Sequence, residues 1–143
     1  MRVTMMLADH AQVADGKLFI SGGGWSICGP GASPCAVAIL FHVPWQETDR
    51  KVSFTLRLLD EDGRGVHQPG PQSAVPVHVN GHFEAHRTAA TAPGSEITVP
   101  MCFNIILQLE PGGRYSWALE IDGHSDDAWQ LSFATRQAQA AAR

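Results

Sequence analysis

The residues with the clearest metal-binding chemistry are three histidines and a glutamate in one short segment. His78, His82, Glu84 and His86 are separated by even numbers of residues, so on a strand all four side chains project from the same face. Residues two apart on a strand lie about 6.6 Å apart, close enough to share one ion, whereas His78 and His86 would lie about 26 Å apart. The pattern has two interpretations. One is a metal site made by His82, Glu84 and His86 with a ligand from a neighbouring strand. The other, which we favour, is a solvated strand face above an apolar core.

The spacing of serine, histidine, aspartate and cysteine does not favour nucleophilic catalysis. The segment Gly24–Cys28 lacks the final glycine of the G-x-S-x-G turn of serine hydrolases. Residues 124–126 (His-Ser-Asp) are contiguous, so their side chains point apart and cannot form the hydrogen bonds of a catalytic triad. Three cysteines lie in or beside apolar segments, where buried, reduced thiols are expected: Cys28, Cys35 and Cys102. We therefore expect no catalytic residue and no cofactor.

Two other motifs resemble ligand sites only in part. Residues 122–126 alternate acidic and polar side chains like the start of an EF-hand, but glycine at the sixth place and glutamate at the twelfth are missing. Gly22–Gly24 is followed by an extended segment instead of the helix that a phosphate loop requires. We expect a β-bulge at these glycines, with Trp25 packed over the gap.

Composition limits the classes of partner. The chain has 143 residues, 44% of them hydrophobic, and a net charge of −4 without a basic stripe, so nucleic-acid binding is not expected. It has no apolar run of the roughly 18 residues that a membrane helix needs, and its cysteines are odd in number and form no C-x-x-C motif. We expect a cytoplasmic protein that does not contact a membrane.

A period of two dominates the hydrophobic pattern and predicts strands. Phe54, Leu56 and Leu58 alternate with polar residues, which is typical of a half-buried strand. Asp15-Gly16 predicts a tight hairpin turn between two strands, and we expect a longer loop at residues 122–128. The recurrence of strands between turn signals predicts an all-β fold, an antiparallel β-sandwich of about eight strands, immunoglobulin-like or jelly-roll-like. Residues 1–136 would form this single domain, and residues 137–143 a short tail rich in alanine and glutamine.

The strand phases also predict which side chains form the core. We expect one shared core that includes Trp117, Leu119, Phe54, Leu56, Phe103 and Ile105.

Residues 35–43 are apolar on both faces of their predicted strand. Cys35, Val37, Ile39 and Phe41 fall on one face, and Ala36, Ala38 and Leu40 on the other. Either a loop or the tail covers the second face, or another subunit does; we favour the subunit, because the chain has only two lysines to protect its strand edges. The sequence thus predicts a homo-oligomer, most simply a dimer.

Two segments carry a resemblance to a known family. ADHAQVADGKLFISGGGW at residues 8–25 and PGGRYSWALEIDGHSDDAWQLSFATR at residues 111–136, together with Pro44-Trp45 and the turn at residues 60–63, are similar to an uncharacterised family of small bacterial, largely actinobacterial, proteins. The resemblance spans nearly the whole chain. It implies a stand-alone β-rich domain and assigns no activity or functional residue.

The pattern as a whole favours a non-catalytic β-sandwich that binds another protein or itself. The alternative is a small-ligand or metal-binding protein or enzyme that uses the strand face of His82, Glu84 and His86.

Overall fold

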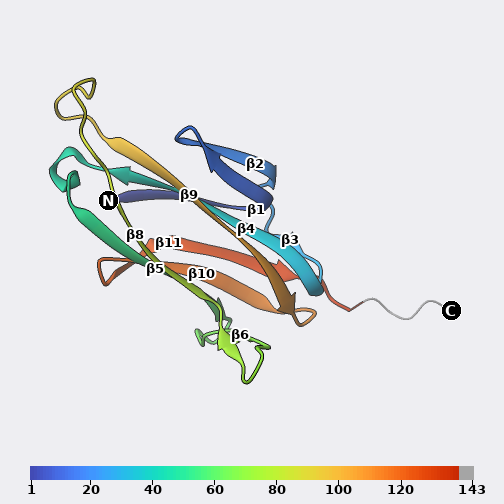
Figure 1. The fold of residues 1–143 in the computed structure, drawn as a ribbon. Coiled ribbons are helices and arrows are strands. Elements are labelled where there is room, and N and C mark those ends of the chain that lie inside the picture. Colours follow the sequence, from blue (N-terminus) through green and yellow to red (C-terminus); the bar gives the residue numbers. More distant parts are fainter. Residues whose placement is uncertain (139–143) are drawn as a thin grey trace.

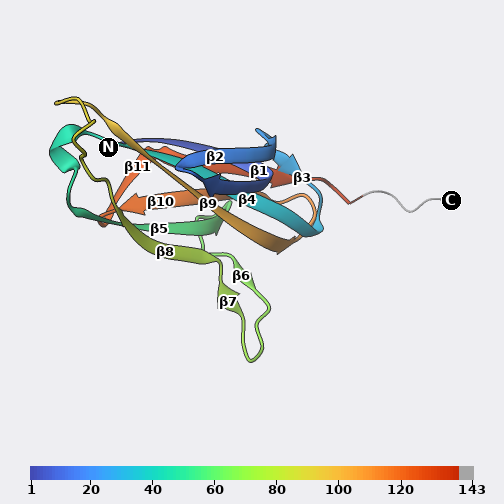
Figure 2. The ribbon, with the colours of Figure 1, turned by 45° about the horizontal axis from the view of Figure 1, so that its top comes forward.

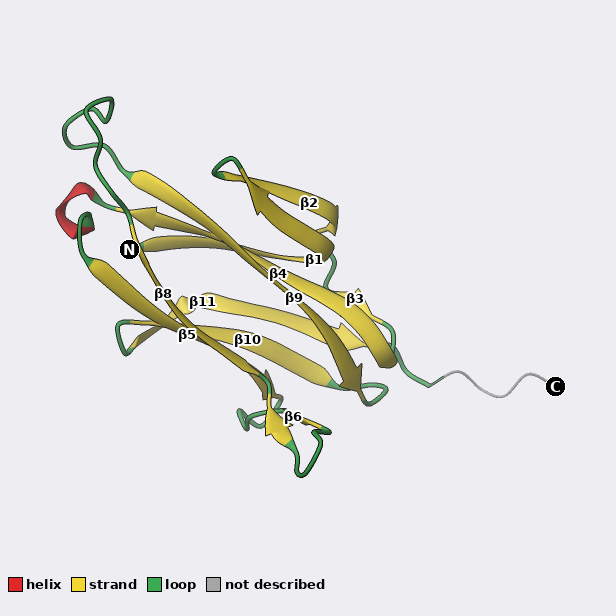
Figure 3. Ribbon diagram, in the orientation of Figure 1, coloured by secondary structure: helices red, strands yellow, loops and turns green. Residues whose placement is uncertain are grey.

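The computed structural model describes residues 1–138 and is all-β, as predicted. This part of the chain contains eleven strands, a single 3₁₀ turn at Trp45–Glu47, and no α-helix (Figure 3). Eight strands have seven or more residues, and three have two residues each. The strands are β1 (Arg2–Ala14), β2 (Lys17–Gly23), β3 (Ile27–Cys28), β4 (Gly31–Val43), β5 (Lys51–Asp60), β6 (His67–Gln68), β7 (Val75–Pro76), β8 (His78–Glu84), β9 (Ile97–Leu109), β10 (Arg114–Ile121) and β11 (His124–Thr135).

The strands form three sheets. The first has the order β2-β1-β4-β9, the second β3-β11-β10-β5-β8, and β6 pairs with β7 in a small third sheet (Figures 1 and 2). Every pairing within them is antiparallel except β3 with β11, which is parallel. The predicted antiparallel pairing thus holds for every strand pair except this short one.

One apolar core is shared by the two larger sheets. Trp117 and Leu56 from the second sheet and Ile39 from the first are fully buried in it. The rings of Phe41 and Phe54 join the sheets at a centroid distance of 5.5 Å. Of the predicted core residues, four are buried members of this cluster, whereas Phe103 and Ile105 on β9 are partly buried and pack against it.

Two hairpins turn on the same dipeptide, Asp-Gly. Asp15 and Gly16 have φ angles of 51° and 69°, and Asp122 and Gly123 have φ angles of 49° and 78°. Positive φ at both central residues is what a type I′ turn requires. The first turn confirms the predicted hairpin. At the second, β11 begins directly at His124, so the expected loop at residues 122–128 is wrong.

The β1–β2 hairpin covers the outer face of β4. Ala36 and Ala38 of β4 are buried against Ala8 and Ala11 of β1. The side chain of Asn104 on β9 fastens the hairpin, since its Oδ1 accepts from the N–H of Ala11 at 3.1 Å and its Nδ2 donates to the C=O of Ala11 at 2.8 Å.

Both faces of residues 35–43 are therefore covered within the chain. Ile39 has an exposed fraction of 0% and lies in the core. The expected subunit interface on this segment is wrong in its position, because a hairpin of the same chain occupies the second face. Self-association itself stays a prediction.

The glycine run does distort the backbone, with φ of 62° at Gly22 and 90° at Gly24. The space above Gly23 is filled by Ile20 and Met6, whose Cγ2 and Sδ lie 2.7 and 2.8 Å from where a Cβ would stand. Trp25 does not cover this gap as expected, and it packs edge-on against Phe133 at 5.9 Å. Of the predicted tail, residues 139–143 lie outside the described residues.

Candidate functional site

The predicted histidine face lies on β8, at the edge of the second sheet. His82 and Glu84 are exposed on the same strand, whereas β8 ends at Glu84 and His86 follows beyond it. Among residues 1–138, no group of three or more histidine, cysteine, aspartate or glutamate side chains stands in a metal-binding arrangement.

His86 lies between two carboxylates. Its Nε2 is 3.4 Å from Oε2 of Glu84, and its Nδ1 is 3.5 Å from Oδ1 of Asp49. The same Asp49 oxygen accepts the backbone N–H of Arg87 at 3.2 Å. When protonated, the imidazole can pair with both carboxylates, which is the chemistry of a solvated ion-pair network on the surface.

The predicted burial of the thiols is confirmed for Cys35 alone, since Cys28 and Cys102 are half-buried. Burial raises the pKa of Cys35 to about 11, and it also raises the pKa of Cys28 and of Cys102. All three cysteines are free. Because the thiolate is the nucleophile, a raised pKa makes these side chains slower nucleophiles at neutral pH.

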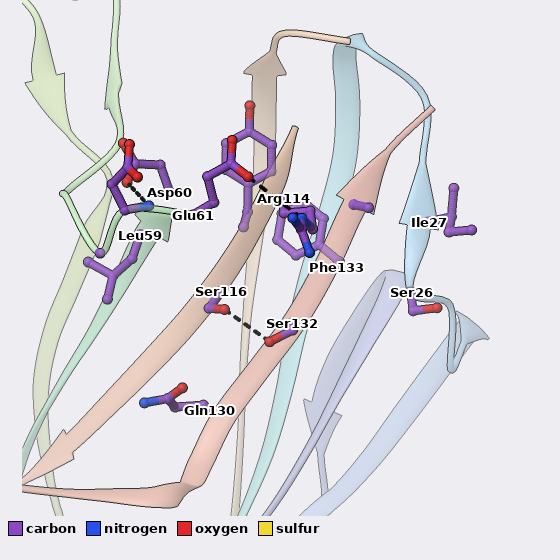
Figure 4. Close-up of a pocket in the computed structure, with 14 residues that line it drawn as sticks. Ser26, Ile27, Leu59, Asp60, Glu61, Arg114, Ser116, Gln130, Ser132 and Phe133 are labelled. Atoms are coloured by element: carbon purple, nitrogen blue, oxygen red, sulfur yellow. Dashed lines mark hydrogen bonds and ion pairs between the residues drawn. The ribbon is translucent and has the colours of Figure 1, made fainter. Parts of the chain in front are cut away.

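A cleft of about 870 Å³ with mixed polar and apolar lining runs along the second sheet beside the β5–β6 turn and β3 (Figure 4). Ser116 and Ser132 face one another in it, with their Oγ atoms 3.0 Å apart, and Arg114 pairs with Glu61 at 3.6 Å. Asp60 is engaged by its own turn, where its Oδ1 accepts two backbone N–H groups. Neither histidine nor cysteine is among the described residues that line the cleft, and its carboxylates are Asp60, Glu61 and Asp62.

The most distinctive backbone feature is the free edge of β9. Gln68 of the β6–β7 hairpin reaches this edge and binds Gln108 there. The Nε2 of Gln68 donates to the C=O of Gln108 at 2.9 Å, and the N–H of Gln108 donates to the Oε1 of Gln68 at 2.7 Å. Both backbone groups of Gln108 therefore point away from β4.

The register between β4 and β9 shows which other residues of β9 point their backbone groups away from β4, as Gln108 does. β4 and β9 pair without a shift from Gly31↔Leu109 to Val43↔Ile97, and in an antiparallel ladder successive residues alternate between inward and outward backbone groups. The even-numbered residues of β9 therefore present N–H and C=O to the free edge. Pro100 agrees with this parity, because proline has no N–H to give a ladder and is confined to such positions.

Between these two residues the edge is open. No hydrogen bond between residues 1–138 involves the backbone groups of Cys102, Asn104 or Ile106 on that side. Residues 97–109 contain no charged side chain, and Ile106 has an exposed fraction of 74%. Figure 2 shows β9 running diagonally across the front of the molecule.

The other sheet edges are shorter or better guarded. β8 carries His78, His82 and Glu84, and β2 is distorted by the positive φ of Gly22. β3 has two residues and leaves residues 124–133 of β11 as the edge, which carries Asp126 and Asp127. Charges, bulges and short edge strands are the usual protections against unwanted pairing, and β9 lacks all three over its open part.

The similarity of the chain to known proteins agrees with the resemblance found in its sequence. The model of a family of unknown function, DUF6941, matches residues 3–134. The chain belongs to this family. No curated protein is significantly similar to it. Membership of DUF6941 confirms an uncharacterised β-rich family and assigns no residue a role.

Sequence reasoning missed the residues that define the edge of this DUF6941 protein. Pro100 is the one residue from which the sequence could have indicated this edge, since proline within a strand is typical of edge strands. Gln68 carried no signal, because its partner Gln108 is distant in the sequence and only the fold brings them together.

The structure also contains no helix in residues 1–138 that is long and apolar enough to cross a membrane.

Proposed function

We propose that this DUF6941 protein is a non-catalytic interaction or assembly protein that accepts an extended strand of a partner chain at the edge of β9. The architecture that we propose for it is a β-sandwich, immunoglobulin-like or jelly-roll-like, and the setting is the bacterial cytoplasm. The observation that carries the proposal is the open, uncharged edge from Cys102 to Ile106.

Main-chain pairing supplies the affinity in this mode of recognition. An extended segment added to β9 would satisfy the N–H and C=O groups of Cys102, Asn104 and Ile106, and pockets for alternate side chains would give specificity. The side-chain amide of Gln68 already binds Gln108 as a strand would. One residue of this edge is thus paired in the way that we propose for the next three.

The partly buried side chains of β9 support a partner strand at the same place. Met101, Phe103 and Ile105 point toward the core but are only partly buried there. A strand alongside β9 would bury more of their apolar surface, and about 25 cal/mol is gained per Å² of such surface.

The edge can be tested with a proline variant and a matched control. Ile106→Pro removes an outward N–H while leaving the ladder to β4 intact, as Pro100 already does, whereas Ile106→Val keeps the N–H. We expect octapeptides selected from a random display library against the wild-type protein to bind Ile106→Val within about threefold and Ile106→Pro at least tenfold more weakly. Equal binding to the proline variant, or a library without binders, would contradict the proposal.

The second candidate function is metal or small-ligand binding by His82, Glu84 and His86. The observation in its favour is the 3.4 Å distance between Glu84 and His86, which brings two potential ligands together. Titration of untagged protein with Zn²⁺ in a calorimeter tests it. Stoichiometric binding that is lost in His86→Ala would support the site. A titration without binding heat would rule out a zinc site at these residues.

A further inference from the structure

We propose that the strand paired with β9 is β9 of a second copy, related to the first by a two-fold axis that passes beside Asn104. This inference rests on the proposed strand addition and names its partner. The assembly would join the two four-stranded sheets into one continuous sheet of eight strands.

The limits of the open edge are symmetric about Asn104. On one side Pro100 has no N–H, and on the other side Gln108 is already bound by Gln68. Each lies four residues from Asn104. Between these limits, the residues whose outward N–H and C=O are both free are therefore Cys102, Asn104 and Ile106.

A two-fold axis perpendicular to the sheet pairs two antiparallel strands. In such a pair, the numbers of any two opposite residues add to the same total. The register centred on Asn104 places Cys102 opposite Ile106 of the second copy and Asn104 opposite its own mate. In this register every free pair of backbone groups between Pro100 and Gln108 meets another free pair. A shift of the centre by one residue in either direction would place Asn104 opposite Cys102 or Ile106 and leave another free residue opposite Pro100 or the occupied Gln108.

The side chains are compatible with this register on both faces. On the outer face the exposed Ile106 would lie beside Cys102, and on the inner face Phe103 would lie beside Ile105. The partly buried core residues of the two copies would thus cover one another. No like charges meet, because residues 97–109 are uncharged.

The residue at the axis is held in place before association. Both side-chain atoms of Asn104 are bonded to Ala11 of the same chain, which turns its amide toward the hairpin and leaves only its backbone at the edge. The strand therefore needs little ordering when it pairs, and preorganised surfaces lose less entropy on binding.

A disulfide trap tests both the partner and the register. In the Ile106→Cys variant, the new thiol would lie opposite Cys102 of the second copy, and hydrogen-bonded cross-strand pairs have Cα atoms about 5.5 Å apart, within the range of a disulfide. With oxidised glutathione as the electron acceptor, two thiols lose two protons and two electrons and form each S–S bond. We expect most of the protein to become a covalent dimer whose peptides link position 102 to position 106. Within one chain these positions are four residues apart on a strand, about 13 Å, and cannot be bridged.

The controls keep the outcomes distinct. The double variant Cys102→Ser with Ile106→Cys should remain uncrosslinked, and so should Ile106→Ser. A folded Ile106→Cys protein that stays monomeric, or a dimer linked through two copies of Cys102, would overturn the inference. If the trap fails while selected peptides still distinguish Ile106→Pro from Ile106→Val, the edge binds another chain and only the second copy is ruled out as its partner.

Discussion

A glycine in β8 offers a sharp test of the packing between strands. Gly81 lies opposite Phe54 on β5, and a Cβ at Gly81 would stand 2.6 Å from Cζ and 2.9 Å from Cε1 of that ring. The ring has little freedom to retreat, because Phe54 has an exposed fraction of 5% and packs against other phenylalanines. Their centroid distances are 5.5 Å to Phe41, 6.3 Å to Phe83 and 5.9 Å to Phe103.

The expected cost of Gly81→Ala follows from two opposing terms. Overpacking of a dense core costs about 1–3 kcal/mol, and replacing glycine by alanine returns about 0.4–1 kcal/mol through the unfolded chain. We therefore expect a net loss of about 1–2 kcal/mol in the free energy of unfolding, measured by urea denaturation. Gly65→Ala is the control, because nothing lies within 4 Å of its Cβ position, and we expect it to be neutral or slightly stabilising.

A second substitution shows whether the ring is the cause. Phe54→Leu shortens the side chain at the point of contact, so Gly81→Ala should cost at least 1 kcal/mol less in that background, which a double-mutant cycle measures. The reasoning is refuted if Gly81→Ala is neutral in the wild-type protein, or if its cost is the same with leucine at position 54.

Three further predictions concern the core, the thiols and acid stability. Trp117→Ala should cost about 3–5 kcal/mol in thermal unfolding, because the side chain is fully buried, and an unchanged melting temperature would mean that the strand phase is wrong. A thiol reagent should label Cys35 slowly in the native protein and fast in urea, since burial raises its pKa to about 11; rapid native labelling would contradict this. The pKa of Asp122 is lowered, mainly by the N–H of Ser53 and also by Arg50, so its contribution to stability is full above about pH 4 and is lost as the pH falls through the folded pKa. Urea titrations should accordingly show a shallower acid loss in Asp122→Asn than in the wild type, and parallel curves would contradict the assignment.

Local patterns predicted the strands because alternation is a property of a few neighbouring residues. The residues of 35–43 fall on the two faces as their spacing indicates, with Ile39 in the core and Ala36 under the hairpin. What covers Ala36 could not be predicted, since it depends on where β1 bends after its pairing with β4. The Asp122-Gly123 turn is different. It repeats the signal of Asp15-Gly16, and the polar residues that follow it led us to expect a loop.

Sheet edges are harder to predict because they are a property of the topology. Val75 and Phe83 would face the same way on one continuous strand, yet Phe83 is buried and Val75 has an exposed fraction of 48%, since the strand is interrupted between β7 and β8. The histidine pattern likewise runs past the end of β8, so His86 meets Asp49 and not only its own strand. Side chains at even spacing share one face only as far as the strand continues.

An unguarded edge that pairs with itself also explains how association could stop at two copies. A two-fold contact uses the same surface on both chains, so pairing through β9 leaves neither copy with a free β9 edge. The opposite edge of the joined sheet is formed by β2 and by residues 2–7 of β1, which pair with β4 alone. At β2 the positive φ of Gly22 interrupts the ladder, and bulged edges resist further pairing. Pro100 and Gln68 bound a run of three open positions on β9, and these are the positions that the symmetric register uses. The same devices that protect most of the edges of this protein would therefore confine strand addition to one place and favour a closed pair over an open-ended fibre.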